Sequence, residues 1–168
     1  VTGVQTCALP ISFHGKWYHQ SWKGDETKSG GVAANIGIHF FDMLLWVFGP
    51  VETVIANHRA VDSASGVLRF ADADVRWFLS INANDLPAEV AERGQRTYRS
   101  VLLDGEEVEF SDGFTELHTD SYRHILATGG FGLDDAEPSI QLVHQIRHLD
   151  TTGATGDYHP LAKSAMAR

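Results

Sequence analysis

The chain has 168 residues, 43% of them hydrophobic and 21% charged, which is typical of a globular domain that buries a core. Thirteen basic residues against 22 acidic ones leave a formal net charge of −9, and this balance argues against general nucleic-acid binding, which depends on Lys and Arg. Cys7 is the only cysteine, so an internal disulfide is excluded and a reducing, cytoplasmic setting is expected.

The first twelve residues, VTGVQTCALPIS, carry no charge and no clear period, and they lack the basic start and apolar centre of a secretory signal. They resemble the translated sequencing-adapter read-through found at the ends of some metagenomic assemblies. We therefore predict that residues 1–12 are non-native and that the biological sequence begins near Phe13, in the tail of a longer gene. Residues 13–168 are then one domain. A frayed natural terminus is the alternative.

A loop followed by a helix is predicted next. Residues 14–31 mix aromatic side chains with Lys, His, Asp and Gly and show no sustained period, which indicates a loop. The helix is expected over about 30–48, with Ser29 as its N-cap. The pair Gly49-Pro50 follows and ends it by the usual Gly-then-Pro signal.

Three polar side chains interrupt this apolar helix. Asn35, His39 and Asp42 are spaced four and three residues apart, a spacing that brings side chains to one face of a helix. His39 and Asp42 also break the apolar run 36–48, so no stretch is expected to reach the roughly 18–20 residues of a membrane span. A helix that only fills a core does not need them. They therefore form a site or are satisfied polar residues of the core.

Strands follow the helix. Residues 51–61 are rich in β-branched side chains and predict a strand. Residues 65–84 alternate on both sides of the sequence ADAD, which indicates a hairpin. Residues 97–112 predict a second hairpin, because Asp104-Gly105 is a dipeptide that a type I′ turn prefers.

Two further helices are predicted, over 115–130 and 136–153, the second with Pro138 in its first turn, and the polar tail 154–168 predicts a loop. The order is a helix, hairpin-connected strands and then two helices. It predicts an α+β fold with a mostly antiparallel open sheet and helices on one face. The other face is expected to meet a second domain or another subunit.

Two motif-like stretches do not meet their requirements. TGGFGLDD lacks the third glycine of a dinucleotide fingerprint and follows a helix instead of a strand. HQIRH has the spacing of two zinc ligands, with Gln145 where a catalytic Glu is required. The sequence therefore predicts no cofactor-binding site and no metal site in this chain.

The stretch GKWYHQSWKGDETKSGGVAANIGIHFFDMLLWVFGP resembles the Gfo/Idh/MocA oxidoreductase family, whose second domain begins with a GG-x3-D-x3-H-x2-D motif. Asn35 stands where the family usually has Asp. The stretches DGEEVEFSDGFTELHTDSYRHIL, GFGLDDAEPSIQLVHQIR and GDYHPLA resemble the branch that oxidises UDP-N-acetylglucosaminuronic acid. The likeness runs over about residues 15–162.

The resemblance implies the C-terminal part of an NAD-dependent dehydrogenase that converts the C3 hydroxyl of this nucleotide sugar into a ketone. It implies a role in making cell-surface polysaccharide that contains di-N-acetylated mannuronate. NAD and a catalytic Lys would belong to an N-terminal Rossmann domain that is missing, so this chain alone is not expected to turn over. The expected partners are the nucleotide sugar and further copies of the chain through the open sheet face, with neither nucleic acid nor membrane.

The resemblance also assigns roles to residues. His39 is the expected base for the hydroxyl proton, because histidine ordinarily titrates near neutral pH, and Asn35 hydrogen-bonds the same hydroxyl or orients the ring. Asp42 is equally explained as a brace for a neighbouring loop. The residues expected to bind the substrate are Lys16, Ser21, Trp22, Lys23, Gly31 and Asp42. Two alternatives stay open: a family member acting on another sugar or a cyclitol, and a non-catalytic binding or assembly module.

Overall fold

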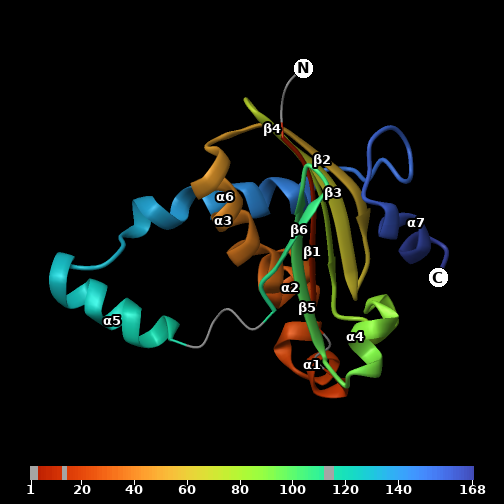
Figure 1. Cartoon of the computed structure of the whole chain (residues 1–168), viewed down its shortest axis with the longest axis horizontal. Coiled ribbons are helices and arrows are strands. Elements are labelled where there is room, and N and C mark those ends of the chain that lie inside the picture. Colours follow the sequence, from red (N-terminus) through yellow and green to blue (C-terminus); the bar gives the residue numbers. More distant parts are fainter. Residues whose placement is uncertain (1–3, 13–14, 112–115) are drawn as a thin grey trace.

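A computed structural model describes residues 4–12, 15–111 and 116–168 (Figure 1). Its strands form one open sheet in the order β2-β3-β4-β1-β5-β6. The strands are β1 (Val4–Ser12), β2 (Val51–Arg59), β3 (Ser63–Phe70), β4 (Ala73–Ser80), β5 (Thr97–Leu103) and β6 (Glu106–Glu109). Strands β1 and β4 run parallel, and the other neighbouring pairs run antiparallel. The predicted mostly antiparallel open sheet with helices is confirmed.

Helices cover the sheet unequally. They are α1 (Lys16–Gln20), α2 (Glu26–Ser29), α3 (Ile38–Phe48), α4 (Ala88–Glu92), α5 (Leu117–Thr128), α6 (Leu133–His148) and α7 (Pro160–Met166). Helices α3 and α6 lie on one face of the sheet and α7 lies on the other, so the expectation of helices on one face only was wrong (Figure 1). Alternation along β4 explains both contacts, because Trp77 packs edge-on against Phe41 of α3, whereas Phe78 packs against Ala162 and Ala165 of α7.

Residues 4–12 form the strand between β4 and β5. The backbone of Ile11 is in register with Ser80 on one side and Tyr98 on the other, and its side chain is fully buried. This segment therefore occupies an inner position of the sheet. A place in the sheet does not test where this segment comes from, so the assignment of residues 1–12 as non-native stays a prediction.

The predicted helix over 30–48 has an irregular beginning. Gly30 ends α2 in the left-handed conformation (φ 79°), and the N–H of Gly31 donates to Ser29 Oγ at 3.1 Å. The segment Ala33–Gly37 is then π-helical and leads directly into α3. A π segment inside a helix is rare and is frequent at functional sites.

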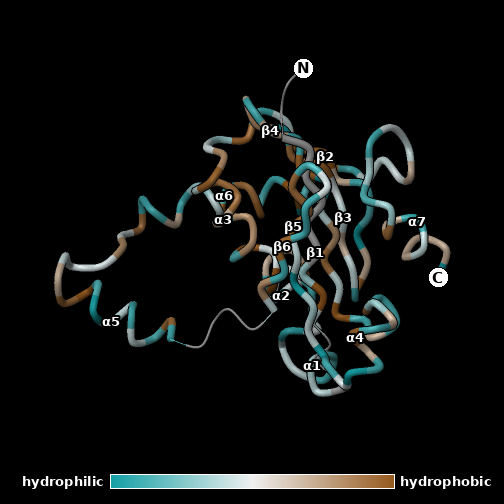
Figure 2. The backbone as a smooth tube through the Cα atoms, in the orientation of Figure 1, coloured by the Kyte–Doolittle hydropathy of each residue, from teal (hydrophilic) through white to brown (hydrophobic). Residues whose placement is uncertain are grey.

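The segment Glu26–Phe48 is long and apolar enough to cross a membrane by length and composition, contrary to the expectation from the sequence. The core helix of a soluble protein passes the same test. Phe40, Phe41 and Leu44 of α3 are buried in the core that α3 shares with the sheet, where hydrophobic residues gather (Figure 2). Packing against the sheet therefore accounts for part of this apolar composition, since 33% of the apolar window is buried.

The turn predictions were more accurate than the loop predictions. Asp104 (φ 49°) and Gly105 (φ 93°) join β5 to β6, which confirms the left-handed turn. The loop expected over 14–31 contains the short helices α1 and α2, and the tail contains α7, so both loop predictions were wrong. Helix α6 begins earlier than expected, which places Pro138 inside the helix and beyond its first turn.

Candidate functional site

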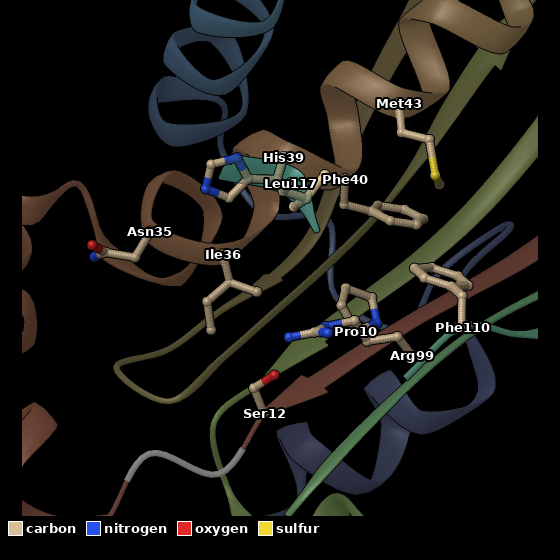
Figure 3. A pocket seen from close by; sticks show the side chains of 10 residues that line it. All are labelled: Pro10, Ser12, Asn35, Ile36, His39, Phe40, Met43, Arg99, Phe110 and Leu117. Atoms are coloured by element: carbon tan, nitrogen blue, oxygen red, sulfur yellow. The ribbon is translucent and has the colours of Figure 1, made fainter. Parts of the chain in front are cut away.

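A cavity of about 470 Å³ opens beside the start of the long helix (Figure 3). One wall comes from the π-helical segment and α3, and the other comes from β1, β5 and the residues after β6. The lining residues are Pro10, Ser12, Asn35, Ile36, His39, Phe40, Met43, Arg99, Phe110 and Leu117. An apolar lining with a few polar groups is typical of a pocket for a small molecule.

The two residues predicted to be catalytic both line this cavity. His39 lies in the first turn of α3 and is exposed, so its imidazole is accessible to a ligand. Asn35 Nδ2 donates to the Gly31 carbonyl at 3.0 Å, and the Asn35 side chain points away from His39 (Figure 3). Burial raises the pKa of Tyr18, whereas a hydrogen bond with the Asn35 side chain acts to lower it. Asn35 is therefore held between the helix start and a buried phenol.

Arg99 lines the opposite wall and was missed by the sequence analysis. Its Nη1 donates to the Ser111 carbonyl at 3.3 Å, and its backbone N–H donates to Ser111 Oγ at 3.0 Å. Burial lowers the pKa of Arg99. The alternation of side chains along β5 could have indicated Arg99, because it lies two residues before the buried Val101 and thus on the same face of the sheet.

Three of the predicted substrate ligands form a surface cluster outside the cavity lining. Ser21 Oγ donates to the Tyr18 carbonyl at 2.9 Å and accepts from the Lys23 N–H at 3.3 Å. Lys23 Nζ lies 5.8 Å from the Trp17 ring centroid and 5.9 Å from that of Trp22, a cation–π arrangement. Substrate binding by Ser21, Trp22 and Lys23 stays a prediction.

The remaining predicted ligands differ in their placement. Lys16 begins α1, and its side chain lies outside the described part of the structure. Gly31 has a left-handed backbone (φ 74°) and supplies the carbonyl that holds Asn35. Asp42 is exposed in a second concavity, between α3 and the start of α6, which it shares with His39. The structure therefore brings His39 together with Asn35 on one side and with Asp42 on the other.

Two glycines of the stretch before α6 lie at the ends of helices. Gly129 ends α5 in the left-handed conformation, and the Gly132 N–H donates to Asp135 Oδ2 at 2.6 Å where α6 begins. Among the described residues, no group of three His, Cys, Asp or Glu side chains is placed to hold a metal ion. The described residues do not fit a dinucleotide, because no glycine-rich turn joins a strand to a helix at the cavity.

Comparisons with known proteins agree with this architecture. The oxidoreductase family, C-terminal alpha/beta domain (Gfo/Idh/MocA), matches residues 3–161. The chain is similar to the WlbA (WbpB) dehydrogenase from Thermus thermophilus in complex with NAD and alpha-ketoglutarate, at 46% identity and a TM-score of 0.89, over 95% of this chain and 52% of that chain. The same dehydrogenase in complex with NAD and UDP-GlcNAcA matches at 45% identity and a TM-score of 0.88, with the same coverage of both chains.

The WlbA dehydrogenase from Bordetella pertussis, in complex with NADH and UDP-GlcNAcA, shares the fold at 18% identity and a TM-score of 0.59. That match covers 88% of this chain and 51% of the other. The present chain thus spans about half the length of each of these solved proteins.

Proposed function

From the premise that this chain belongs to the Gfo/Idh/MocA oxidoreductase family as its C-terminal alpha/beta domain, we propose that it is the substrate-binding half of an NAD-dependent dehydrogenase. The proposed reaction oxidises the C3 hydroxyl of UDP-N-acetylglucosaminuronic acid, in the formation of a cell-surface polysaccharide. The proposal includes a cytoplasmic location and assembly of copies through the open sheet face.

One observation carries the proposal. His39 lines a largely apolar cavity in a chain that is 45% identical to a dehydrogenase solved with NAD and UDP-GlcNAcA. A histidine in such a position suits proton transfer at neutral pH, which every oxidation of an alcohol to a ketone requires. The apolar lining from Ile36, Phe40 and Met43 supports water exclusion around the reacting carbon.

The division of labour follows from what the chain holds. We assign NAD, which accepts the hydride from the carbinol carbon, to the half of the protein that this chain does not span. His39 then accepts the hydroxyl proton on an imidazole nitrogen, and the developing ketone keeps its oxygen. Asn35, tied to the Gly31 carbonyl, keeps the π-helical segment in the form that presents His39. Asn35 cannot itself accept the hydroxyl proton, as a carboxylate at position 35 could, because an amide does not titrate.

The test begins with the source DNA upstream of this reading frame. We expect it to encode a strand–GxGxxG–helix unit, and we expect the completed protein to form NADH from NAD and UDP-GlcNAcA. His39→Ala is expected to lower kcat by about 10²–10⁴-fold. His118→Ala, an exposed histidine on α5, is the matched control and should leave kcat unchanged. Absence of NADH formation by the completed wild type overturns the proposal.

The alternatives give different results in the same assays. A family member with another substrate forms NADH with a different sugar or cyclitol and not with UDP-GlcNAcA. A binding or assembly module keeps its oligomeric state and its function in His39→Ala, and it forms no NADH with any of these alcohols.

A further inference from the structure

Helix α5 extends away from the rest of the described chain. Its twelve residues include no buried side chain, and every described residue from 116 to 138 is exposed or half-buried. Figure 1 shows α5 standing clear of the sheet and of α3. A helix of about this length is only marginally stable in water without tertiary packing. Within the described chain, α5 therefore lacks much of the packing that its length requires.

One face of α5 is an apolar stripe. Tyr122, Ile125 and Leu126 are spaced three and four residues apart, which brings their side chains to one face of the helix, and all three are exposed. Asp120 and Arg123 pair with each other at 2.9 Å away from this face. The stripe therefore presents apolar groups and one hydroxyl, without a carboxylate.

The turn after α5 fixes the position of the helix. The ring of His124 stacks on that of Phe131, with the centroids 4.4 Å apart. Gly130 is left-handed (φ 82°), and a Cβ there would lie 2.9 Å from Ile125 Cγ1, so the turn closes tightly against the helix. Helix α5 and residues 129–132 together form an arm. Docking a preformed arm costs less conformational entropy than docking a disordered segment.

The second concavity, of about 750 Å³ between α3 and the start of α6, matches this stripe. Leu45 and Trp46 contribute apolar surface to it, and Trp46 is exposed. Asp42 and Asp135 add carboxylates to the lining. A helix suited to this concavity has an apolar stripe, no carboxylate and a hydrogen-bond donor. The hydroxyl of Tyr122 is such a donor.

The arm cannot enter the concavity of its own chain in its present form. Phe131 and Gly132, which connect the arm to α6, are part of the concavity wall. Folding α5 back over that wall would change the left-handed turn and separate His124 from Phe131. A second copy presents the same concavity without this constraint. When two copies exchange arms around a two-fold axis, each contact occurs twice.

The exposed side chains give the size of such a contact. Trp46, Tyr122 and Phe131 are 87%, 67% and 78% exposed, and an aromatic side chain buries about 150–250 Å². The three rings of one copy thus offer about 350–580 Å², and a two-fold exchange doubles this area. Leu126 and Leu133, both 88% exposed, add apolar area, which brings the total toward the roughly 1,200–2,000 Å² of a stable interface.

The half of the protein that this chain does not span is the other candidate occupant. The proposed function places NAD, and therefore that half, at the cavity that Asn35 lines. The second concavity lies on the α6 side of His39, where Asp42 and not Asn35 is in the lining. To this extent the choice of a second copy rests on the proposed function.

We propose that two copies of this chain exchange arms, so that α5 of each copy docks in the second concavity of the other. The stripe then packs on Trp46, and the Tyr122 hydroxyl donates to the carboxylate of Asp42 or Asp135. His39 lines the same concavity, so the docked helix covers the side of His39 that faces α6. This contact is separate from the assembly proposed through the open sheet face, and one oligomer can contain both.

Disulfide trapping in the completed protein identifies the occupant. Two forms of different length, one with Leu126→Cys and one with Trp46→Cys, are coexpressed, oxidised and separated by non-reducing electrophoresis. Both carry Cys7→Ala, which removes the native cysteine of this chain. A disulfide-linked heterodimer is expected, because the two positions meet in the exchange. Ala127→Cys in place of Leu126→Cys is the matched control, since Ala127 is exposed on α5 away from the stripe, and it should trap little heterodimer.

Sedimentation of the completed protein measures the strength of the contact. Leu126→Asp places a carboxylate in the stripe, where it meets the carboxylates of the concavity. The loss of one apolar contact corresponds to about 10- to 100-fold in affinity, and both arms lose it together. The dissociation constant of the pair should therefore rise by about 10²- to 10⁴-fold. Ala127→Asp is the matched control and should keep the wild-type dissociation constant.

The outcomes separate the arm exchange from the proposed function. A wild-type dissociation constant in Leu126→Asp overturns the exchange. A disulfide within one chain that carries both Leu126→Cys and Trp46→Cys, or a cross-link from Leu126→Cys to the half that this chain does not span, also overturns it. A trapped heterodimer without NADH formation supports the exchange and overturns the proposed oxidation. NADH formation without a trapped heterodimer supports the oxidation and overturns the exchange.

Discussion

Lowering the pH from 7 to 5 is expected to destabilise the chain through His159. This side chain is 3% exposed, and its ring stacks on Phe78 with the centroids 5.7 Å apart. Burial, with the positive charge of Arg76 as the smaller cause, lowers the pKa of His159 from 6.5 to about 4. The neutral Nδ1 accepts a hydrogen bond from the Leu161 N–H at 3.2 Å, which caps the start of α7.

The sign and the size follow from proton linkage. The pKa of His159 is lower in the folded chain than in the unfolded chain, so the unfolded chain takes up the proton first as the pH falls. The stability contributed by the neutral ring is present above pH 6.5 and is lost between pH 6.5 and about 4. The full loss is about 3 kcal/mol, and the part lost between pH 7 and pH 5 is about 2 kcal/mol.

Urea denaturation followed by tryptophan fluorescence at pH 7 and pH 5 measures this loss. In His159→Asn the side chain can still cap the helix and does not titrate. Between pH 7 and pH 5 the free energy of unfolding of this variant should therefore fall by about 2 kcal/mol less than that of the wild type. Burial also lowers the pKa of His58, and its contribution cancels because both proteins contain it. An equal loss in the two proteins, or an NMR titration of His159 with a midpoint near 6.5, refutes the reasoning.

Three further substitutions test packing, pairing and turn geometry, each by urea denaturation of the chain. Gly37→Ala should cost about 1–3 kcal/mol, because a Cβ would lie 2.7 Å from Leu79 Cδ1. Asp85→Ala should cost about 2–3 kcal/mol, because Arg168, which donates to this carboxylate at 2.7 and 2.9 Å, loses its buried partner. Asp104→Val should cost about 1–3 kcal/mol, because a β-branched residue is strained at φ 49°, whereas Asp104→Asn should be near neutral. An unchanged midpoint contradicts the argument behind that substitution.

Features that depend on neighbouring residues were predictable from the sequence. The left-handed turn at Asp104-Gly105 follows from that dipeptide, and the apolar pattern of 30–48 predicted a helix, which the structure shows with a π-helical beginning at Ala33–Gly37. The resemblance to the family rested on such local patterns and identified His39 and Asn35, which both line the cavity.

Features that depend on packing between distant segments were decided by the tertiary structure. Residues 160–166 were predicted to be part of a loop, and they form α7, whose Ala162 and Ala165 pack against Phe78 on the second face of the sheet. Arg99 joins the cavity of His39 because strand pairing and sheet alternation bring β5 opposite the long helix. Asp42 lines the second concavity, which His39 also lines, and not the cavity that contains Asn35 and Arg99, because α6 and not the sheet lies on that side. A helical or strand period predicts which residues share a face, and only the packed chain decides what that face meets.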